Sequence, residues 1–259
     1  MDWIYAVSGL TVGLVVGMTG VGGGSLMTPL LVIGFGVAPV TAVGTDLLYA
    51  GLTKAGGTVA RSRLGSVNWR IAGLLALGSV PAALATTAAL SRISSDDAHF
   101  GAILTTALGV ALILSAIALV FKERLQRFAN NRAAETVAGR VRHAAVLTTA
   151  VGALLGLLVT LTSVGAGALG AIALLLLYPQ LPANHVAGTD IVHAVPLTLV
   201  AGAGHAVAGT VNYALLGSLL VGSLPGILLG SLLSHRLPDA VVRRALAVVL
   251  LAVGVKLVM

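Results

Sequence analysis

The sequence of 259 residues contains no cysteine, and only 9% of its residues are charged and 4% are aromatic. Without cysteine, the chain can form neither disulfides nor thiolate metal sites. Because charged residues make up about one quarter of a typical soluble domain, their scarcity argues against a soluble fold. No basic cluster precedes the first hydrophobic run, so we expect no cleavable signal peptide. The chain also lacks a nucleotide-binding loop, so coupling to ATP would need a separate subunit.

Hydrophobic residues, in contrast, make up 58% of the chain and recur in runs close to the ~20 residues that cross a bilayer. The runs cover residues 4–34, 36–60, 71–90, 98–121, 144–178, 185–208, 213–233 and 239–258. The net charge of +7 comes from bases that lie beside the hydrophobic ends, where they set topology. The sequence therefore predicts an all-α polytopic membrane protein that is surrounded by the lipid bilayer and has no nucleic acid partner.

The second half of the chain repeats the first with an offset of 144 residues. The tripeptide Gly-Thr-Asp at 44–46 returns at 188–190, and Asn68 returns as Asn212. Matches that keep one order and nearly one spacing indicate a duplication rather than chance. We divide the chain into a first transmembrane repeat (1–121), a basic cytoplasmic linker (122–143) and a second transmembrane repeat (144–259).

The first hydrophobic run of each repeat is too long for one crossing. Residues 4–34 would form a helix of about 46 Å, whereas the hydrocarbon core is ~30 Å thick. The run either tilts strongly or turns back at its glycines. A hairpin in each repeat leaves only Arg92 and Lys256 on the face opposite the basic linker, which agrees better with the positive-inside rule.

Three crossings per repeat then make the second repeat inverted relative to the first, with both termini outside and the linker inside. We therefore expect two inverted repeats of four hydrophobic segments, the first segment of each being a glycine-broken helical hairpin. This arrangement contains about 8 to 10 helices in all.

Glycines interrupt each long run, at 18–25 (Met-Thr-Gly-Val-Gly-Gly-Gly-Ser) and at 161–168 (Leu-Thr-Ser-Val-Gly-Ala-Gly-Ala). A backbone break at membrane depth persists only where protein or a water-filled cavity surrounds it. Glycine lets backbone N–H groups approach a ligand, and the following half-helix presents its positive end, so the expected ligand is an anion. The alternative is close helix packing by small residues. The predicted substrate-binding residues are Thr19, Gly22, Gly23, Gly24, Ser25, Thr162, Ser163, Gly165 and Gly167.

Four further polar residues lie inside hydrophobic runs: Asp46, Lys54, Asp190 and His193. An ionisable side chain costs ~2.5 kcal/mol or more at the centre of a membrane helix and usually serves a function. Asp46 and Asp190 could couple transport to protons or to another ion, or they could cap helices near the membrane surface. Lys54 could pair with Asp46, extend to the cytoplasmic face or meet an anionic substrate. We predict that these four residues contact the substrate or the coupling ion.

The second repeat alone contains His185, His193 and His205. The spacing of His185, Asp190 and His193 is loosely like that of nickel and cobalt permeases, so a divalent metal-ion permease is the alternative function. An intramembrane hydrolase is a third class, because Ser25 and His205 could form a dyad, but their spacing does not support it. We expect no enzymatic activity, no cofactor and no resident metal. The sequence leaves the oligomeric state open, a homodimer included.

These features resemble a known family. The resemblance is carried by residues 20–30 (Gly-Val-Gly-Gly-Gly-Ser-Leu-Met-Thr-Pro-Leu), by residues 42–46 (Ala-Val-Gly-Thr-Asp) and by the duplicated layout of the whole chain. These two motifs and this layout are similar to those of the TauE/SafE sulfite exporter family, also called the TSUP permeases. In the second repeat, Ala166 and Ala168 stand where the first repeat has glycine and serine.

The resemblance implies a multi-pass carrier of the bacterial inner membrane. Such carriers move small sulfur-containing or organic anions, such as sulfite, sulfoacetate or other sulfonates, often in the export direction. Together with the two broken hairpins, this resemblance leads us to expect a secondary transporter that works by alternating access.

Overall fold

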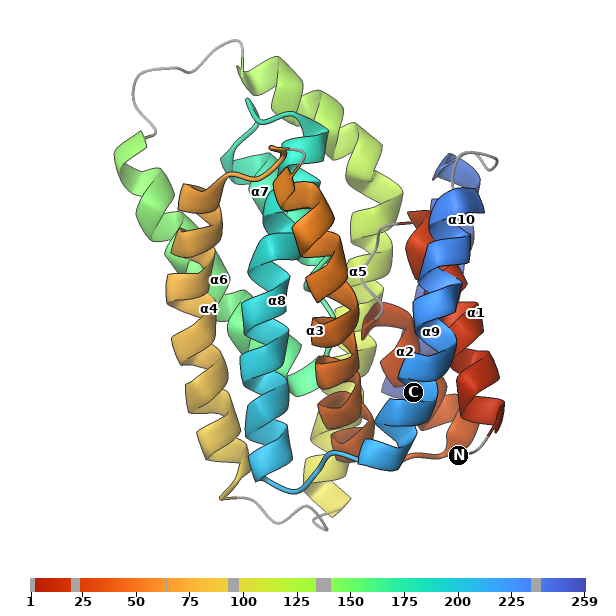
Figure 1. Cartoon of the computed structure of the whole chain (residues 1–259). Helices are drawn as coiled ribbons and strands as arrows, with labels where there is room; N and C mark the ends of the chain where they lie inside the picture. The colour runs from red at the N-terminus through yellow and green to blue at the C-terminus, as the bar shows by residue number, and fades with distance from the viewer. Residues whose placement is uncertain (1–2, 20–23, 64, 93–97, 134–140, 234–238) are drawn as a thin grey trace.

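The chain is built from helices in the computed structural model, which describes residues 3–19, 24–63, 65–92, 98–133, 141–233 and 239–259 (Figure 1). The elements are α1 (Trp3–Thr19), α2 (Gly24–Pro29), the π-helical segment η1 (Leu30–Gly34), α3 (Pro39–Arg63), α4 (Trp69–Leu90), α5 (Ala98–Ala133), α6 (Val141–Thr162), α7 (Ala168–Leu177), α8 (Ala183–Val207), α9 (Tyr213–Leu233) and α10 (Asp239–Val258). No strand occurs within these ranges. The prediction of an all-α polytopic membrane protein is confirmed.

Within the described ranges, five helices are long and apolar enough to cross a membrane by composition alone: α4, α5, α6, α8 and α9. The predicted linker, residues 122–143, overlaps both of its neighbours, because α5 continues to Ala133 and α6 begins at Val141.

Both long first runs are hairpins. In Figure 1, α3 begins at the lower end, where α1 also begins, and α8 begins at the upper end, where α6 also begins. The chain therefore returns to its own side through α2 and η1 in the first repeat and through α7 in the second. The alternative of two extended, tilted helices does not occur.

The two repeats run in opposite directions. α3 rises in Figure 1 whereas α8 descends, and the beginning of α1 and the end of α10 both lie toward the lower end. The packing is two-fold: α1 packs on α9 as α6 packs on α4, while α3 packs on α8 and α5 on α10. A Cβ built at Gly109 would lie 2.9 Å from the carbonyl oxygen of Gly254, and one built at Gly254 would lie 2.9 Å from that of Gly109. The predicted inverted repeat is thus present.

Glycines allow α1 to contact α9, and α6 to contact α4, along their backbones. A Cβ built at Gly78 of α4 would lie 1.9 Å from the carbonyl oxygen of Thr149 in α6, and one built at Gly222 of α9 would lie 1.8 Å from that of Ala6 in α1. Membrane helices associate through such close packing of small residues, since lipid tails are as apolar as leucine. Each repeat is therefore held by the first helix of the other.

Replacing Gly78 with alanine should destabilise the protein by about 1–3 kcal/mol, because the added methyl group meets backbone atoms that cannot move aside. Thermal unfolding of the purified protein in detergent measures the effect. Gly73, in the same helix, is the matched control because a Cβ there meets nothing within 4 Å. Equal stability of the two alanine variants would contradict the backbone contact.

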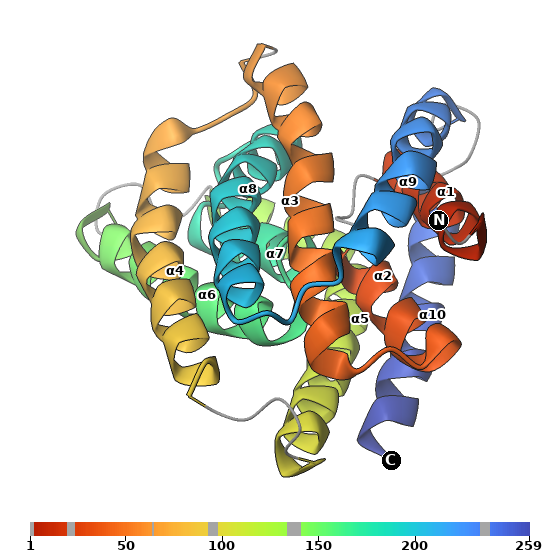
Figure 2. The same ribbon diagram turned by 60° about the horizontal axis from the view of Figure 1, so that its bottom comes forward.

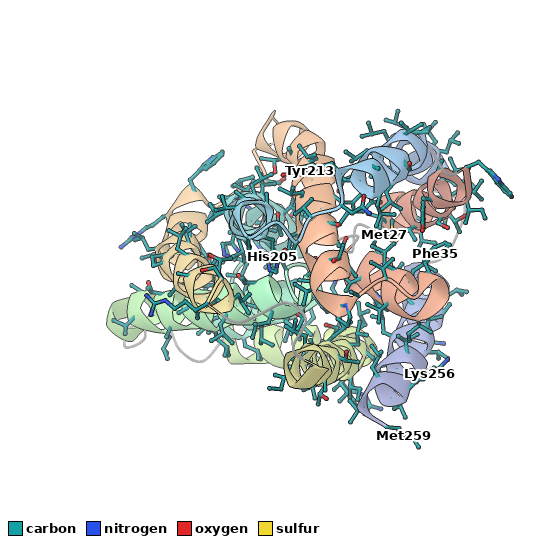
Figure 3. The ribbon with its side chains drawn as sticks, turned by 90° about the horizontal axis from the view of Figure 1, so that it is seen from below. Met27, Phe35, His205, Tyr213, Lys256 and Met259 are labelled. Carbon is teal, nitrogen blue, oxygen red and sulfur yellow. The ribbon has the colours of Figure 1, made fainter. Side chains whose placement is uncertain are left out.

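α3 and α8 lie side by side at the centre of the molecule, between the two groups of peripheral helices (Figure 2). Figure 3 looks from the lower end and shows His205 of α8 on one side of α3, and Met27 of α2 on the other. Both helices carry buried polar side chains, which include Thr45 and Thr189. Among the described residues, every buried Asp, Lys and His side chain belongs to the second segment of a repeat: Asp46, Lys54, Asp190, His193 and His205.

Two reciprocal hydrogen bonds join the repeats at opposite ends of α3 and α8. The lower cross-repeat bond runs from the backbone amide of Asn212 to Thr45 Oγ1, over 3.1 Å. The upper cross-repeat bond runs from the backbone amide of Asn68 to Thr189 Oγ1, over 2.9 Å. The side chains of Asn68 and Asn212 in turn accept backbone bonds at the starts of α4 and α9, over 3.2 Å and 3.0 Å. Each asparagine therefore both caps a helix and binds the other repeat.

Candidate functional site

The second glycine break turns sharply between α6 and α7. Ser163, Gly165 and Gly167 have φ values of 57°, 116° and 139°, which are conformations that glycine adopts without steric cost. Ser163 is the only non-glycine residue with positive φ in the described chain. Residues 162–166 of this turn are buried, so the break lies inside protein as its backbone requires.

Several backbone amides of the second break remain available. Among the described residues, no backbone acceptor binds the amides of Gly165, Ala166 and Gly167. Thr162 Oγ1 is already used within the turn, where it donates to the carbonyl oxygen of Leu158 over 2.7 Å and accepts from the amide of Val164 over 3.2 Å. The hydroxyl of Ser163 is buried and has no hydrogen-bond partner in the described part of the chain. The turn thus presents N–H and O–H donors.

Lys54 of α3 reaches across the repeat interface to this turn. Its ammonium group donates to the carbonyl oxygen of Ala166 over 2.8 Å, and only 9% of the residue is exposed. Lys54 therefore does not extend to the cytoplasmic face, and Asp46 is not its only partner. Its charge interacts with Asp190 and, less strongly, with Asp46. The equivalent position in the second repeat, Thr198, bonds only within its own helix, to the carbonyl oxygen of Ala194 over 2.8 Å.

Asp46 is fully buried near the beginning of α3. It accepts a hydrogen bond through Oδ2 from the hydroxyl of Thr28 in α2. Ser163 of the second break faces the same carboxyl group. Asp46 is therefore positioned between the first hairpin and the second break, and it does not serve as an N-cap at the membrane surface.

Asp190 occupies the equivalent place in α8 and is 2% exposed. Its Oδ1 atom is buried with no hydrogen-bond partner among the described residues. The carboxyl group packs against α7, because a Cβ built at Gly170 would lie 2.0 Å from Oδ1. Lys54 and Lys122 are the positive charges that act on Asp190. We call Asp46, Lys54, Ser163 and Asp190 the buried polar cluster.

His193 lies one helical turn after Asp190. Its Nε2 atom is 2.9 Å from the hydroxyl of Ser79 in α4. His205 contacts the carbonyl oxygen of Thr160 over 3.1 Å through Nε2. No three His, Asp or Glu side chains converge as metal ligands anywhere in the described ranges.

The first glycine break is described only at its edges. Thr19 ends α1, Gly24 begins α2 and Ser25 is buried, whereas Gly22 and Gly23 lie outside the described residues. Its role in substrate binding stays a prediction. The structure brings the other predicted residues into one region. They are Asp46 and Lys54 of α3, Asp190 and His193 of α8, and Ser163, Gly165 and Gly167 of the second break. Thr162 lies in the same turn, but its hydroxyl is already hydrogen-bonded there.

Sequence reasoning missed several residues that hold this region together. Thr28 binds Asp46, Ser79 binds His193, and the carbonyl group of Ala166 receives Lys54. None of these residues is charged. Thr28 and Ala166 lie within the two glycine-containing segments described above, but nothing in those segments marks either residue as a hydrogen-bond partner. Thr45 and Thr189 did carry a signal, because each belongs to the repeated Gly-Thr-Asp tripeptide.

Comparisons with known proteins place this arrangement in a family. The profile of the family described as sulfite exporter TauE/SafE matches residues 5–257. A protein of Bacillus subtilis (strain 168) with the name probable membrane transporter protein YjnA is 38% identical over 250 residues, which cover 96% of this chain and 97% of that protein.

A second protein of the same organism, with the name probable membrane transporter protein YdhB, is 28% identical over 243 residues, or 90% of this chain and 91% of that protein. No solved structure gives a significant match. The match to the family profile extends over both hairpins, both central helices and the buried polar cluster. The chain is therefore a multi-pass membrane transporter that belongs to the sulfite exporter TauE/SafE family.

Proposed function

We propose that this chain is a secondary transporter of small sulfur-containing or organic anions, such as sulfite, sulfoacetate or other sulfonates. The observation that carries the proposal is the position of Lys54. Its ammonium group lies against a glycine break in which three amides have no backbone acceptor among the described residues. The family profile and its description as a sulfite exporter support the substrate class. We further propose that the protein works in the export direction across the bacterial inner membrane.

The anion binds where Lys54 meets the second break. An ammonium group is a compact charge with three donors, and one of them is used on Ala166. The amides of Gly165 and Gly167 and the hydroxyl of Ser163 supply neutral donors, and the start of α7 adds its partial positive charge. Oxyanions of sulfur bind readily to such donor sets because they accept several hydrogen bonds at once.

The first break completes the site from the opposite side. The inverted arrangement predicts that Thr19, Gly22, Gly23, Gly24 and Ser25 face the substrate as the second break does. Asp46 connects the two sides, since its carboxyl group accepts from Thr28 of the first hairpin and faces Ser163 of the second break. A substrate at this point lies between the repeats, where relative movement of the repeats changes access to it.

Alternating access follows from the two-fold packing. The lower and upper cross-repeat bonds are chemically equivalent and lie at opposite ends of α3 and α8. Separation of the repeats at one end breaks one bond and leaves the other formed. We infer that the transporter opens to each side by breaking these bonds in turn.

The proposal is tested by flux in proteoliposomes that contain the purified protein. Radiolabelled sulfite and radiolabelled sulfoacetate should enter loaded vesicles by counterflow, and Gly167→Ala should lower the rate by about 10-fold or more, because φ of 139° strains any residue with a Cβ. Absence of flux for every sulfur-containing anion tested with the wild-type protein would contradict the proposed function.

Gly217→Ala is the matched control for Gly167→Ala. Gly217 is a helical glycine of the same repeat, and a Cβ there meets nothing within 4 Å. We expect wild-type flux from it. Divalent nickel or cobalt is the comparison substrate, because metal uptake without anion flux would favour a metal permease.

A further inference from the structure

The two membrane aspartates are equivalent in sequence but not in their contacts. Asp46 and Asp190 are related by the 144-residue offset and are both buried. Asp46 is held by the hydroxyl of Thr28 in the first hairpin. The second hairpin offers no such hydroxyl, since Gly170 and Ala171 occupy the corresponding part of α7. Among the described residues, Asp190 therefore has no hydroxyl donor of the kind that stabilises the negative charge of Asp46.

The surroundings of Asp190 contain few charges. α3 contributes Asp46 and Lys54, and α5 contributes Lys122. α4 presents the neutral Ser79, which binds His193 on the same helix as Asp190. The described parts of α6 and α7 carry no titratable side chain between residues 144 and 177. Lys54 is thus the main positive partner of Asp190, and it is also the residue that binds the anion in the proposed function.

An anion that binds to Lys54 changes the charge balance of the buried polar cluster. Asp46, Lys54 and Asp190 already carry one negative charge in excess when all three are ionised, and a monovalent anion adds a second. Uncompensated charge is expensive at membrane depth. A proton on one carboxyl group removes the excess. Oδ1 of each aspartate lacks a partner among the described residues, but Oδ2 of Asp46 accepts from Thr28, so Asp190 is the carboxyl group for which these residues supply no donor.

We propose that Asp190 carries the proton that accompanies the anion through the transport cycle. This inference rests on the proposed function. In the loaded state, the anion occupies Lys54 and Asp190 is protonated. In the empty state, the proton has left to the solution and the Asp190 carboxylate takes the place of the anion beside Lys54. One proton therefore moves with each monovalent anion, transport is electroneutral, and its direction follows the combined concentration gradients of the anion and the proton.

Transport of methanesulfonate tests this assignment, because this probe keeps a single negative charge at all working pH values. In proteoliposomes, wild-type flux should not respond to a potassium diffusion potential and should acidify the compartment that receives the anion. Asp190→Asn should abolish the acidification and make the remaining flux sensitive to the potential. Asp46→Asn is the matched comparison, and it should keep electroneutral flux at a reduced rate. The same phenotype from Asp46→Asn, or electrogenic wild-type flux, would overturn the assignment.

Chemical labelling supplies a second test that needs neither a variant nor a known substrate. Dicyclohexylcarbodiimide reacts with protonated carboxyl groups in apolar surroundings, and peptide mass spectrometry locates the product. In the wild-type protein, we expect labelling of Asp190, stronger in acidic than in alkaline buffer, and little labelling of Asp46. Preferential labelling of Asp46 would overturn the inference. Labelling of Asp190 in a protein that moves no sulfur-containing anion would instead retain the proton site and reject the proposed function.

Gly170→Ala disturbs the same carboxyl group without changing any charge. The added methyl group would meet Asp190 Oδ1, which lies 2.0 Å from the Cβ position. We expect the variant to lower both methanesulfonate flux and carbodiimide labelling, whereas Gly217→Ala should change neither. Wild-type labelling of Asp190 in Gly170→Ala would show that the carboxyl group does not occupy the site described here.

Discussion

Replacement of Lys54 with methionine is expected to lower anion flux by about 100-fold or more. Lys54 and the bound anion form a buried charge pair, and removal of one partner of such a pair costs about 2–5 kcal/mol of binding free energy. Methionine keeps most of the length of the side chain and removes the only positive charge that α3 places in the buried polar cluster. Counterflow of labelled sulfite and sulfoacetate in proteoliposomes measures the loss. Thr198→Val, at the equivalent position of the second repeat, should retain near-normal flux because its hydroxyl bonds only within α8.

Loss of folding is separated from loss of binding by a double variant. Lys54→Met alone removes the main countercharge of two buried carboxyl groups, so its thermal stability should also fall. Lys54→Met combined with Asp190→Asn removes one positive and one negative charge together. Stability should then recover while anion flux stays low. Recovery of flux in the double variant would show that Lys54 serves charge balance and does not bind the substrate.

Cross-linking either end of the repeat interface should stop transport completely. Because the chain has no native cysteine, the pair Thr45→Cys with Asn212→Cys and the pair Asn68→Cys with Thr189→Cys can each be oxidised in a clean background. The parent contacts are 3.1 Å and 2.9 Å long, so the paired residues are neighbours in the structure. Oxidation should abolish flux in either pair, and reduction should restore it, as measured by counterflow before and after addition of dithiothreitol.

The four single-cysteine variants serve as controls for this experiment, since oxidation cannot link them within one chain. Alternating access requires each end to open in turn, so a bond at one end alone is enough to stop the cycle. Full flux through a protein shown by mass spectrometry to be cross-linked at one end would contradict movement of the repeats at that end. Full flux with both ends linked would exclude the proposed mechanism.

The helical hairpins could be predicted because their cause is local. Residues 4–34 are too long and too rich in contiguous glycine for one straight crossing, and the distribution of arginine and lysine favours a return to the same side. The inversion of the second repeat follows from three crossings per repeat. These properties depend on hydrophobic length, backbone freedom and topology, and each of them can be counted along the chain.

The helix partners could not be predicted in the same way. α1 packs on α9 and α4 on α6, so each repeat exchanges a helix with the other. Glycines such as Gly78 and Gly222 permit backbone contact, but many glycines of this chain have the same spacing. Which surfaces meet is decided by three-dimensional fit over whole helices, and that fit has no short sequence motif.

The position of Lys54 shows the same limit at a single residue. Its place two turns after Asp46 suggested a pair on one helix or an extension to the cytoplasmic face. In the folded chain, its ammonium group instead reaches Ala166, which is 112 residues away in sequence. A long flexible side chain can bind any acceptor on a segment that packs against its helix. For Lys54 that segment is the second break, which packs against α3.

The sequence by itself determined an all-helical membrane protein with duplicated, inverted halves and a glycine break in each, because hydrophobic length, charge distribution and glycine content act locally. Only the tertiary structure decided which of the two aspartates is held by a hydroxyl group and for which the described residues supply no donor. The reason is that both aspartates follow Gly-Thr in the sequence, whereas different helices pack against them: Thr28 of α2 meets Asp46, and Gly170 of α7 meets Asp190.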